Sequence, residues 1–461
     1  MGSYKLIDTF VNDDIINQRI SLSVPLDHRH KKSEKITIVA NITQKYEKKL
    51  HHDASKVTFP RDSKPIAYIQ GGPGFSCTVP LSNSGLTKVL LDNGYQIIFY
   101  DQRGTGLSTP LETKQLLDFG TVDEAVEYLT RFRADSIVED LEHIRSELFG
   151  KQKWLIMGQS FGGFCCFTYL SFHQESLESV FVTGGVPPVG YIADDVYSQT
   201  YKRTAERNVH FYAKYPQDKI RVKEILGYLR KNEVILPDGG RLSVERFQQL
   251  GLNFGGSGGT DSLHQVVVEF SWALESIGHP TYAVLSKIQL MSRFDTNILY
   301  ALFQECIYAD GKGKATDWAA DRLRYADGNE QFVLNDELLR SEKPVYFTGE
   351  MVYKSMFDDY AQLRPLKEIA MALHSYSDWT PLYDPSGFRT LTWEKVPVVA
   401  ATYYYDQYVD FDLTMRVKTN LFNGNGNLRQ YITSEFFHNG LGANPEKVVG
   451  SLLKLLKNEV D

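Results

Sequence analysis

The segment KWLIMGQSFGGF, residues 153–164, places one serine between glycines directly after a short apolar run. Gly158, Ser160 and Gly162 fit the pattern G-x-S-x-G, in which a nucleophilic serine lies on a sharp turn between a strand and a helix. The glycines stand two residues to either side because a side chain there would collide with the strand or the helix. WLIM is typical of a buried strand, and FCCFTYLSFH, after the motif, is typical of a helix. The pattern predicts that Ser160 is a nucleophile; the alternative is a glycine bend that packs a helix on a sheet.

Short apolar, β-branched runs form two groups along the chain. The first group lies at 35–43, 65–70, 95–101, 153–158 and 179–184, and the second at 395–404 and 428–433. Runs without strict alternation are typical of strands covered on both faces, as in a parallel α/β sheet. The segment 134–150 between them has a repeated apolar face and ends on a glycine, which predicts a helix. The fold class is therefore α/β, with a mostly parallel central sheet.

A long segment rich in helical patterns and aromatic residues separates the two groups of strands. The chain has 461 residues, which is long for one simple core. We expect a sheet domain made of residues 1–187 and 391–461, and an inserted helical cap domain made of residues 188–390. Residues 1–60 form an N-terminal extension, whose strand patterns at 17–24 and 35–43 predict additions to an edge of the sheet.

Composition and charge exclude several classes of protein. Hydrophobic residues make up 42% and charged residues 23%, and the formal net charge of −7 disfavours a nucleic-acid partner. No apolar run is long enough to span a membrane, and the first residues lack the pattern of a secretory signal. The four cysteines have no CxxC spacing and do not form a disulfide framework. We expect a cytoplasmic protein with reduced thiols and no metal or other cofactor, either monomeric or homo-oligomeric.

A nucleophilic serine also needs donors that stabilise an oxyanion. QGGPG, residues 70–74, follows the strand pattern at 65–70, and its paired glycines can turn backbone N–H groups toward a developing charge. The N–H of Phe161, directly after the serine, would supply a second donor. We predict an oxyanion hole made of Phe161 and Gly72, with Gly71 as the alternative to Gly72; an ordinary turn is the other interpretation of QGGPG.

A third glycine-containing motif, DQRGTGLS, follows the next predicted strand at residues 101–108. It lacks the GK[ST] ending of a phosphate-binding loop and begins with an acid. We interpret it as a structural loop beside the oxyanion turn, fixed by hydrogen bonds of Asp101 and Arg103.

The acid and the base of a triad should follow the serine in the order Asp, then His. Asp406 follows the predicted strand at 395–404, and Asp410 is a second candidate for the acid. His438 follows the last predicted strand and precedes small residues. Its neutral imidazole would take the proton of Ser160, while the carboxylate holds the imidazole in the required tautomer.

The three motifs QGGPG, DQRGTGLS and GQSFGG, in this order and spacing, resemble those of the proline iminopeptidase family of α/β-hydrolases. FVTGGVPP, at 181–188, is similar to the longer, fungal-type members. The resemblance runs from about residue 60 to the end of the chain, and it implies an α/β-hydrolase fold with a helical cap. Gln70 stands where the family usually has a histidine, so the hydrogen bonding of that turn must differ.

The resemblance also implies an activity. Family members release an N-terminal proline, or a similar small residue, from peptides, and carboxylates of the cap bind the substrate's ammonium group. A buried cation requires an opposite charge close by. Glu305, in LYALFQECIYAD, and Glu350, in PVYFTGEMVY, are the residues that the resemblance assigns to this role. A solvated helix glutamate is the alternative for each.

Together these features predict a serine aminopeptidase that forms an acyl-enzyme and acts on small peptides with a free N-terminus. Because fold and triad do not fix the acyl group, an esterase or lipase-like hydrolase of small acyl esters is the first alternative. A non-catalytic binding protein on the same scaffold is the second.

Overall fold

The computed structural model describes residues 4–30, 32–47, 57, 63–422 and 426–459. Within this part of the chain nine strands form one sheet, in the order β1-β2-β3-β5-β4-β6-β7-β8-β9. The strands are β1 Lys5–Asn12, β2 Ile15–Pro25, β3 Lys35–Lys45, β4 Lys64–Ile69, β5 Tyr95–Asp101, β6 Trp154–Gln159, β7 Leu177–Thr183, β8 Val398–Tyr403 and β9 Leu428–Thr433. Neighbours from β5 through β9 are parallel, so the predicted mostly parallel sheet is confirmed. Each predicted strand run coincides with one of these strands.

The N-terminal extension forms the antiparallel edge of the sheet. β1, β2 and β3 pair antiparallel in turn, and β3 joins the parallel part through β5, where Val39 lies opposite Asp101. The predicted addition to the sheet edge is thus confirmed for the strand patterns at 17–24 and 35–43, whereas residues 48–56 and 58–60 of the extension lie outside the described part. β1 was not predicted, because an edge strand with no buried residue lacks the apolar signal of the others.

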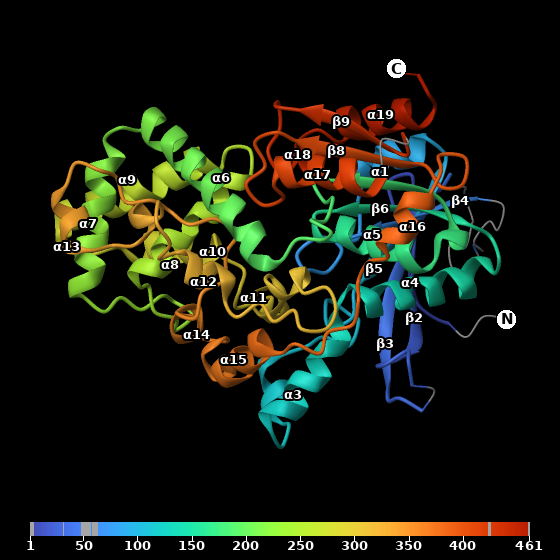
Figure 1. Cartoon of the computed structure of the whole chain (residues 1–461), viewed down its shortest axis with the longest axis horizontal. Helices are drawn as coiled ribbons and strands as arrows, with labels where there is room; N and C mark the ends of the chain where they lie inside the picture. Colours follow the sequence, from blue (N-terminus) through green and yellow to red (C-terminus); the bar gives the residue numbers. More distant parts are fainter. Residues whose placement is uncertain (1–3, 31, 48–56, 58–62, 423–425, 460–461) are drawn as a thin grey trace.

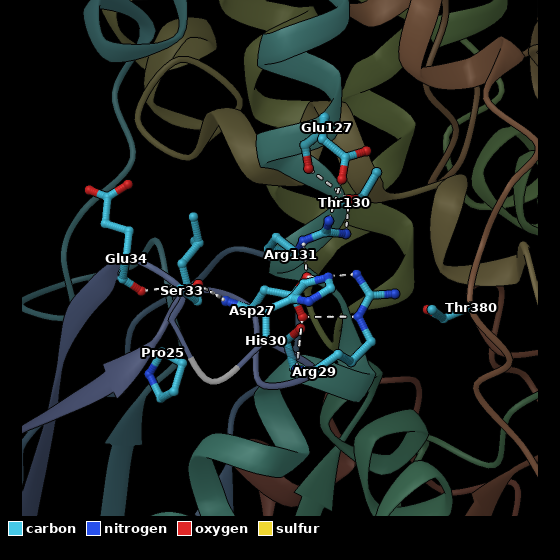
Figure 2. Close-up of polar contacts among 12 residues, drawn as sticks. Pro25, Asp27, Arg29, His30, Ser33, Glu34, Glu127, Thr130, Arg131 and Thr380 are labelled. Carbon is cyan, nitrogen blue, oxygen red and sulfur yellow. Dashed lines mark hydrogen bonds and ion pairs between the residues drawn. The ribbon is translucent and has the colours of Figure 1, made fainter.

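The turn between β2 and β3 is tied to the main domain by ion pairs (Figure 2). Asp27 accepts hydrogen bonds from Arg29, and its Oδ2 lies 2.9 Å from Nε of Arg131. The buried guanidinium of Arg103 donates to the carbonyl of Leu26 and pairs with Asp140, with Nη2 to Oδ1 at 2.6 Å. The extension is therefore an integral part of the fold.

Helices cover both faces of the sheet (Figure 1). On one face the apolar side chains of α1 Gly85–Asp92 and α19 Pro445–Leu456 pack with those of the strands. On the other face lie α4 Ala134–Phe149, α5 Phe161–Phe172, α16 Pro385–Thr390 and α17 Phe411–Phe422. The short helices α2 Thr113–Leu117, α3 Val122–Leu129 and α18 Gly440–Ala443 complete this domain. The helix predicted at 134–150 is confirmed as α4.

A large helical segment follows β7 and ends before β8 (Figure 1). Its helices are α6 Ala193–Lys214, α7 Asp218–Lys231, α8 Val244–Gln248, α9 Gly259–Ile277, α10 Tyr282–Leu290, α11 Ile298–Phe303, α12 Ala319–Leu323, α13 Asp336–Arg340, α14 Met356–Asp359 and α15 Lys367–Ser375. Phe211, Phe247 and Phe347 belong to an apolar cluster of this segment alone, while the buried residues of α11, α12, α14 and α15 share one core with the sheet. The domain boundaries at 188 and 390 stay a prediction. No helix among the described residues is long and apolar enough to cross a membrane.

Candidate active site

Ser160 lies on a sharp turn between β6 and α5. Its φ of 54° and ψ of −126° are unfavourable for a residue with a side chain, as expected where a nucleophile is held out from the end of a strand. The strand and the helix that the sequence predicted on either side of the motif are both present. The Ser160 side chain makes no capping bond to α5, so its hydroxyl is not occupied by the helix that it precedes.

The glycines of the motif are required by close backbone contacts. A Cβ atom on Gly158 would overlap the carbonyl of Gly162, and one on Gly162 would overlap the carbonyl of Ile69. A further glycine was not singled out from the sequence: a Cβ on Gly185 would overlap the carbonyl of Ser160. The turn can therefore keep its shape only if β6, the start of α5 and the chain after β7 carry no side chain at these contacts.

The QGGPG turn lies directly beside Ser160. A Cβ on Gly71 would come 2.9 Å from Cβ and 3.6 Å from Oγ of Ser160. Nε2 of Gln102 donates to the carbonyl of Gln70 at 2.8 Å and so holds the turn through the neighbouring DQRG segment. Phe161 is the first residue of α5, where backbone N–H groups have no partner within the helix. The roles of Gly71, Gly72 and Phe161 in an oxyanion hole stay predictions that this arrangement supports.

The DQRGTGLS segment has the structural role that the sequence predicted. Asp101 accepts hydrogen bonds from the backbone N–H groups of Cys77 and Leu107, at 2.9 and 3.0 Å. Arg103 is 1% exposed and makes its ion pair with Asp140. Both side chains are engaged within the protein and fix the loop next to the QGGPG turn.

The candidate base and acid are in direct contact. Nδ1 of His438 lies 2.7 Å from Oδ2 of Asp406, and both residues are buried. Oδ1 of Asp406 accepts from the N–H groups of Tyr408 and Val409, at 2.8 and 3.0 Å, which fixes the carboxylate. Asp410 has different partners: its Oδ2 lies 2.8 Å from Nε of Arg203. Of the two acids that the sequence left open, Asp406 is the one paired with the histidine.

Two consecutive glycines after β7 connect this pair to the serine. A Cβ on Gly184 would lie 3.4 Å from Oδ2 of Asp406, while Gly185 touches the backbone of Ser160. Asp406 and Ser160 therefore lie on either side of one short segment, at the carboxyl ends of β8 and β6, the two parallel strands that flank β7. This is the edge of an open α/β sheet at which ligands bind.

Burial and the charges of two carboxylates change the pKa of His438 in opposite directions. Burial alone would lower the pKa of the imidazole, but the negative charges of Asp406 and Glu350 outweigh it and raise the pKa above its usual value. The ring of Tyr408 lies 4.6 Å from the His438 ring, between centroids, and covers it. The imidazole is thus in contact with a fixed acid and an aromatic ring, and a carboxylate of the helical segment is close enough for its charge to raise the pKa.

Glu350 is the carboxylate of the helical segment whose charge acts on the histidine. It is 8% exposed, and burial raises its pKa to about 7, although His438 and a hydrogen bond from Tyr300 oppose this rise. The hydroxyl of Tyr300 donates to Oε1 at 2.6 Å, and the side chain of Gln304 also acts to lower the pKa of the carboxyl group. Tyr300 and Gln304 were not predicted; their spacing of four residues in a helical pattern places them on one face and was the available signal.

Glu305 differs from the expectation. Its Oε1 accepts from the N–H of Ala319 at 2.8 Å, and its Oε2 accepts from the N–H of Ala320 at 3.0 Å. The side chain is fully buried, and Nδ1 of His374 lies 3.3 Å from Oε1. Both oxygens therefore hold the start of α12, and the predicted contact of Glu305 with a substrate amine stays a prediction that these hydrogen bonds do not support. Among the described residues no cluster of three or more His, Cys, Asp or Glu could hold a metal ion.

Comparison with known proteins agrees with this geometry. Residues 64–228 match the family model of the α/β hydrolase fold, and the protein is thus an α/β hydrolase. The chain is 37% identical to a proline iminopeptidase of Aeromonas sobria, over 97% of this chain and 98% of the relative. It is 35% identical to a proline iminopeptidase of Aspergillus aculeatus, over 99% and 98% of the two chains. The chain belongs to the proline iminopeptidase family.

Among solved structures, a proline iminopeptidase of Mycobacterium smegmatis aligns with 95% of this chain and 98% of its own, at 14% identity and a TM-score of 0.39.

Proposed function

We propose that the protein is a serine aminopeptidase that releases an N-terminal proline, or a similar small residue, from peptides. The observation that carries the proposal is Glu350, a buried carboxylate of the helical segment whose charge acts on His438. The buried carboxylate provides an opposite charge for the ammonium group of a peptide's free end. A hydrolase of neutral esters gains nothing from it.

The residues of the site have the following roles in this proposal. Ser160 attacks the carbonyl of the first residue while His438 accepts its proton, and Asp406 holds the imidazole in the required tautomer. The N–H groups of Phe161 and Gly72, with Gly71 as the alternative, stabilise the oxyanion. His438 then protonates the leaving amine, and water hydrolyses the acyl-enzyme. No step requires a cofactor.

The ionisation of Glu350 fits the task. With a pKa of about 7 in the free enzyme, the carboxyl group loses its proton readily at neutral pH. An ammonium group at hydrogen-bonding distance favours the charged form further. Tyr300 donates to the same carboxylate and holds it in place.

Two relatives that span nearly the whole chain bear the name proline iminopeptidase, which supports peptides with a free N-terminus as the substrate class. The four cysteines are buried free thiols, in keeping with the reducing environment of the cytoplasm that we propose as the location.

A release assay tests the proposal. Proline, alanine and leucine arylamides and a simple acyl ester are offered to the wild type and to Glu350→Gln. We expect release from the proline arylamide, and a large loss of that activity, but not of ester turnover, in the variant. Ester turnover without proline release, unchanged by the substitution, would establish the esterase alternative instead. Failure of a fluorophosphonate probe to label Ser160 would favour a non-catalytic binding protein.

A further inference from the structure

Helix α6 carries two arginines one turn apart, and their surroundings differ. Arg203 pairs with Asp410 at 2.8 Å, with Asp412 at 2.9 Å and with Glu206 at 3.2 Å. Arg207 makes no hydrogen bond or ion pair with any residue that the structure describes. One guanidinium is neutralised by the protein, and the other keeps a free positive charge.

Arg207 is nevertheless buried and held in place. It is 7% exposed, and its Cζ lies 4.1 Å from the centroid of the Phe437 ring. A stacked aromatic ring orients the plane of the guanidinium but accepts few of its five N–H donors. Nε is sealed from solvent without a partner, and burial lowers the pKa of the group. A buried, oriented cation without an acid is unfavourable in the free protein, and an anionic ligand would relieve this cost.

The place of Arg207 indicates which ligand that is. Phe437 directly precedes His438, and the ring of Tyr408, which contacts the His438 ring, belongs to the surroundings of Arg207 as well. The glycine-rich loop before α9 contacts the residue that follows His438: the N–H of Ser257 donates to Oδ1 of Asn439 at 3.0 Å. Arg207 thus stacks on the residue next in sequence to the imidazole that, in the proposed function, protonates the leaving amine.

We propose that Arg207 binds the C-terminal carboxylate of very short peptides, dipeptides first of all. The inference rests on the proposed aminopeptidase activity and specifies its substrate class. In a dipeptide the carboxylate lies two bonds beyond the leaving nitrogen, so its partner must be a neighbour of the residue that protonates that nitrogen. Glu350 would bind the positive end of the zwitterion and Arg207 its negative end. Bidentate pairing with carboxylates is the geometry that guanidinium favours.

The test compares two substrates that differ only in this carboxylate: Pro-Ala and Pro-Ala amide. We expect the wild type to have a kcat/KM ratio of acid to amide well above one, mainly through KM. Arg207→Gln should lower the ratio roughly 10-fold or more, and tenfold corresponds to about 1.4 kcal/mol. Arg207→Lys should have a ratio between those of the wild type and Arg207→Gln, because lysine keeps the positive charge but lacks the bidentate geometry of guanidinium. Arg429→Gln is the matched control: Arg429 also stacks on an aromatic ring, that of Trp393, and its loss should leave the ratio unchanged.

Three outcomes would overturn the inference. A wild type that does not distinguish acid from amide has no carboxylate subsite. A variant Arg207→Gln that loses activity equally on both substrates indicates that Arg207 only packs α6 on the histidine segment. The third outcome concerns Arg207→Met, which keeps much of the side-chain length but not the charge. If this variant has as high a kcat/KM ratio of acid to amide as Arg207→Lys, the charge has no role. Failure of the proposed function is recognised separately, because then neither Pro-Ala nor Pro-Ala amide nor a proline arylamide is cleaved by the wild type.

Discussion

Nδ1 of His438 lies 2.7 Å from Asp406, whereas Asp410, four residues further on, is bound by Arg203. The two acids therefore have separable effects. Asp406→Asn removes the acceptor that fixes the imidazole tautomer, and we expect kcat to fall by about 10⁴-fold with little change in KM. Asp410→Asn should keep most of the activity but lower the free energy of unfolding by about 1–3 kcal/mol, because Arg203 loses its buried partner. Steady-state kinetics and urea unfolding of both variants check this; the reverse pattern would reassign the acid.

Gly185 offers a test of the turn around the nucleophile from outside the G-x-S-x-G motif. A methyl group at this position would overlap the carbonyl of Ser160, so Gly185→Ala must displace the serine. We expect loss of fluorophosphonate labelling and of turnover. Gly227→Ala is the control, because nothing lies within 4 Å of that position in α7, and alanine in a helix should raise stability by about 0.5–1 kcal/mol. A fully active Gly185→Ala enzyme would contradict the contact.

The local parts of this site could be predicted from the sequence, and the reason is physical. The turn at Ser160 is specified by a strand, the five residues of G-x-S-x-G and a helix. The position of Ser160 could therefore be predicted from neighbouring residues alone. Asp406 and His438 follow from the order of strands, since residues after parallel strands meet at one edge of the sheet.

Residues whose role depends on distant contacts could not be predicted. The carboxylate of Glu305 is engaged by the N–H groups of Ala319 and Ala320, after a bend at which Trp318 has a φ of 57°. Nothing in the local pattern around Glu305 indicates this bend. Arg207 and Phe437 are brought together only by the docking of α6 on the segment of His438. Such contacts require the complete fold.

The ion pairs of Asp27 predict a pH-dependent contribution of the N-terminal extension to stability. Burial would raise the pKa of Asp27, but hydrogen bonds from Arg29 and the charge of Arg131 lower it to about 2 (Figure 2). Because the folded pKa lies below the unfolded value, the stabilisation is present above about pH 4 and is lost as the pH falls toward 2. After allowance for screening of the half-exposed Arg29, we expect Asp27→Asn to cost about 1 kcal/mol at pH 7.

Urea unfolding at pH 7, 5 and 3.5 measures the difference between Asp27→Asn and the wild type. It should be constant down to pH 5 and smaller at pH 3.5. Asp118→Asn is the control, since its ion pair with Lys114 is exposed and should contribute little at any pH. A difference that grows on acidification would contradict the assignment.

Glu305→Gln separates a structural carboxylate from an amine-binding one. The glutamine can offer only one acceptor oxygen to the two N–H groups at the start of α12, so one buried donor is left unsatisfied. We expect the free energy of unfolding to fall by about 1–3 kcal/mol, while KM for a proline arylamide stays within about twofold of the wild type. If KM rises as steeply as in Glu350→Gln without a loss of stability, Glu305 contacts the substrate after all.

Glu350→Gln should change both substrate binding and the pH dependence of catalysis. Loss of the charge that pairs with the ammonium group should lower kcat/KM for a proline arylamide roughly 10- to 100-fold. In the wild type this kcat/KM should rise with pH through about 7, because Glu350 must be charged and His438 neutral.

The same substitution removes a negative charge that raises the pKa of His438, so the acid limb of kcat should move to lower pH. The shift is measured with an acyl ester as the substrate, because an ester without an amino group does not depend on amine binding. Tyr300→Phe is the control, since it keeps the carboxylate of Glu350. An unmoved or higher acid limb would mean that Glu350 does not act on the imidazole.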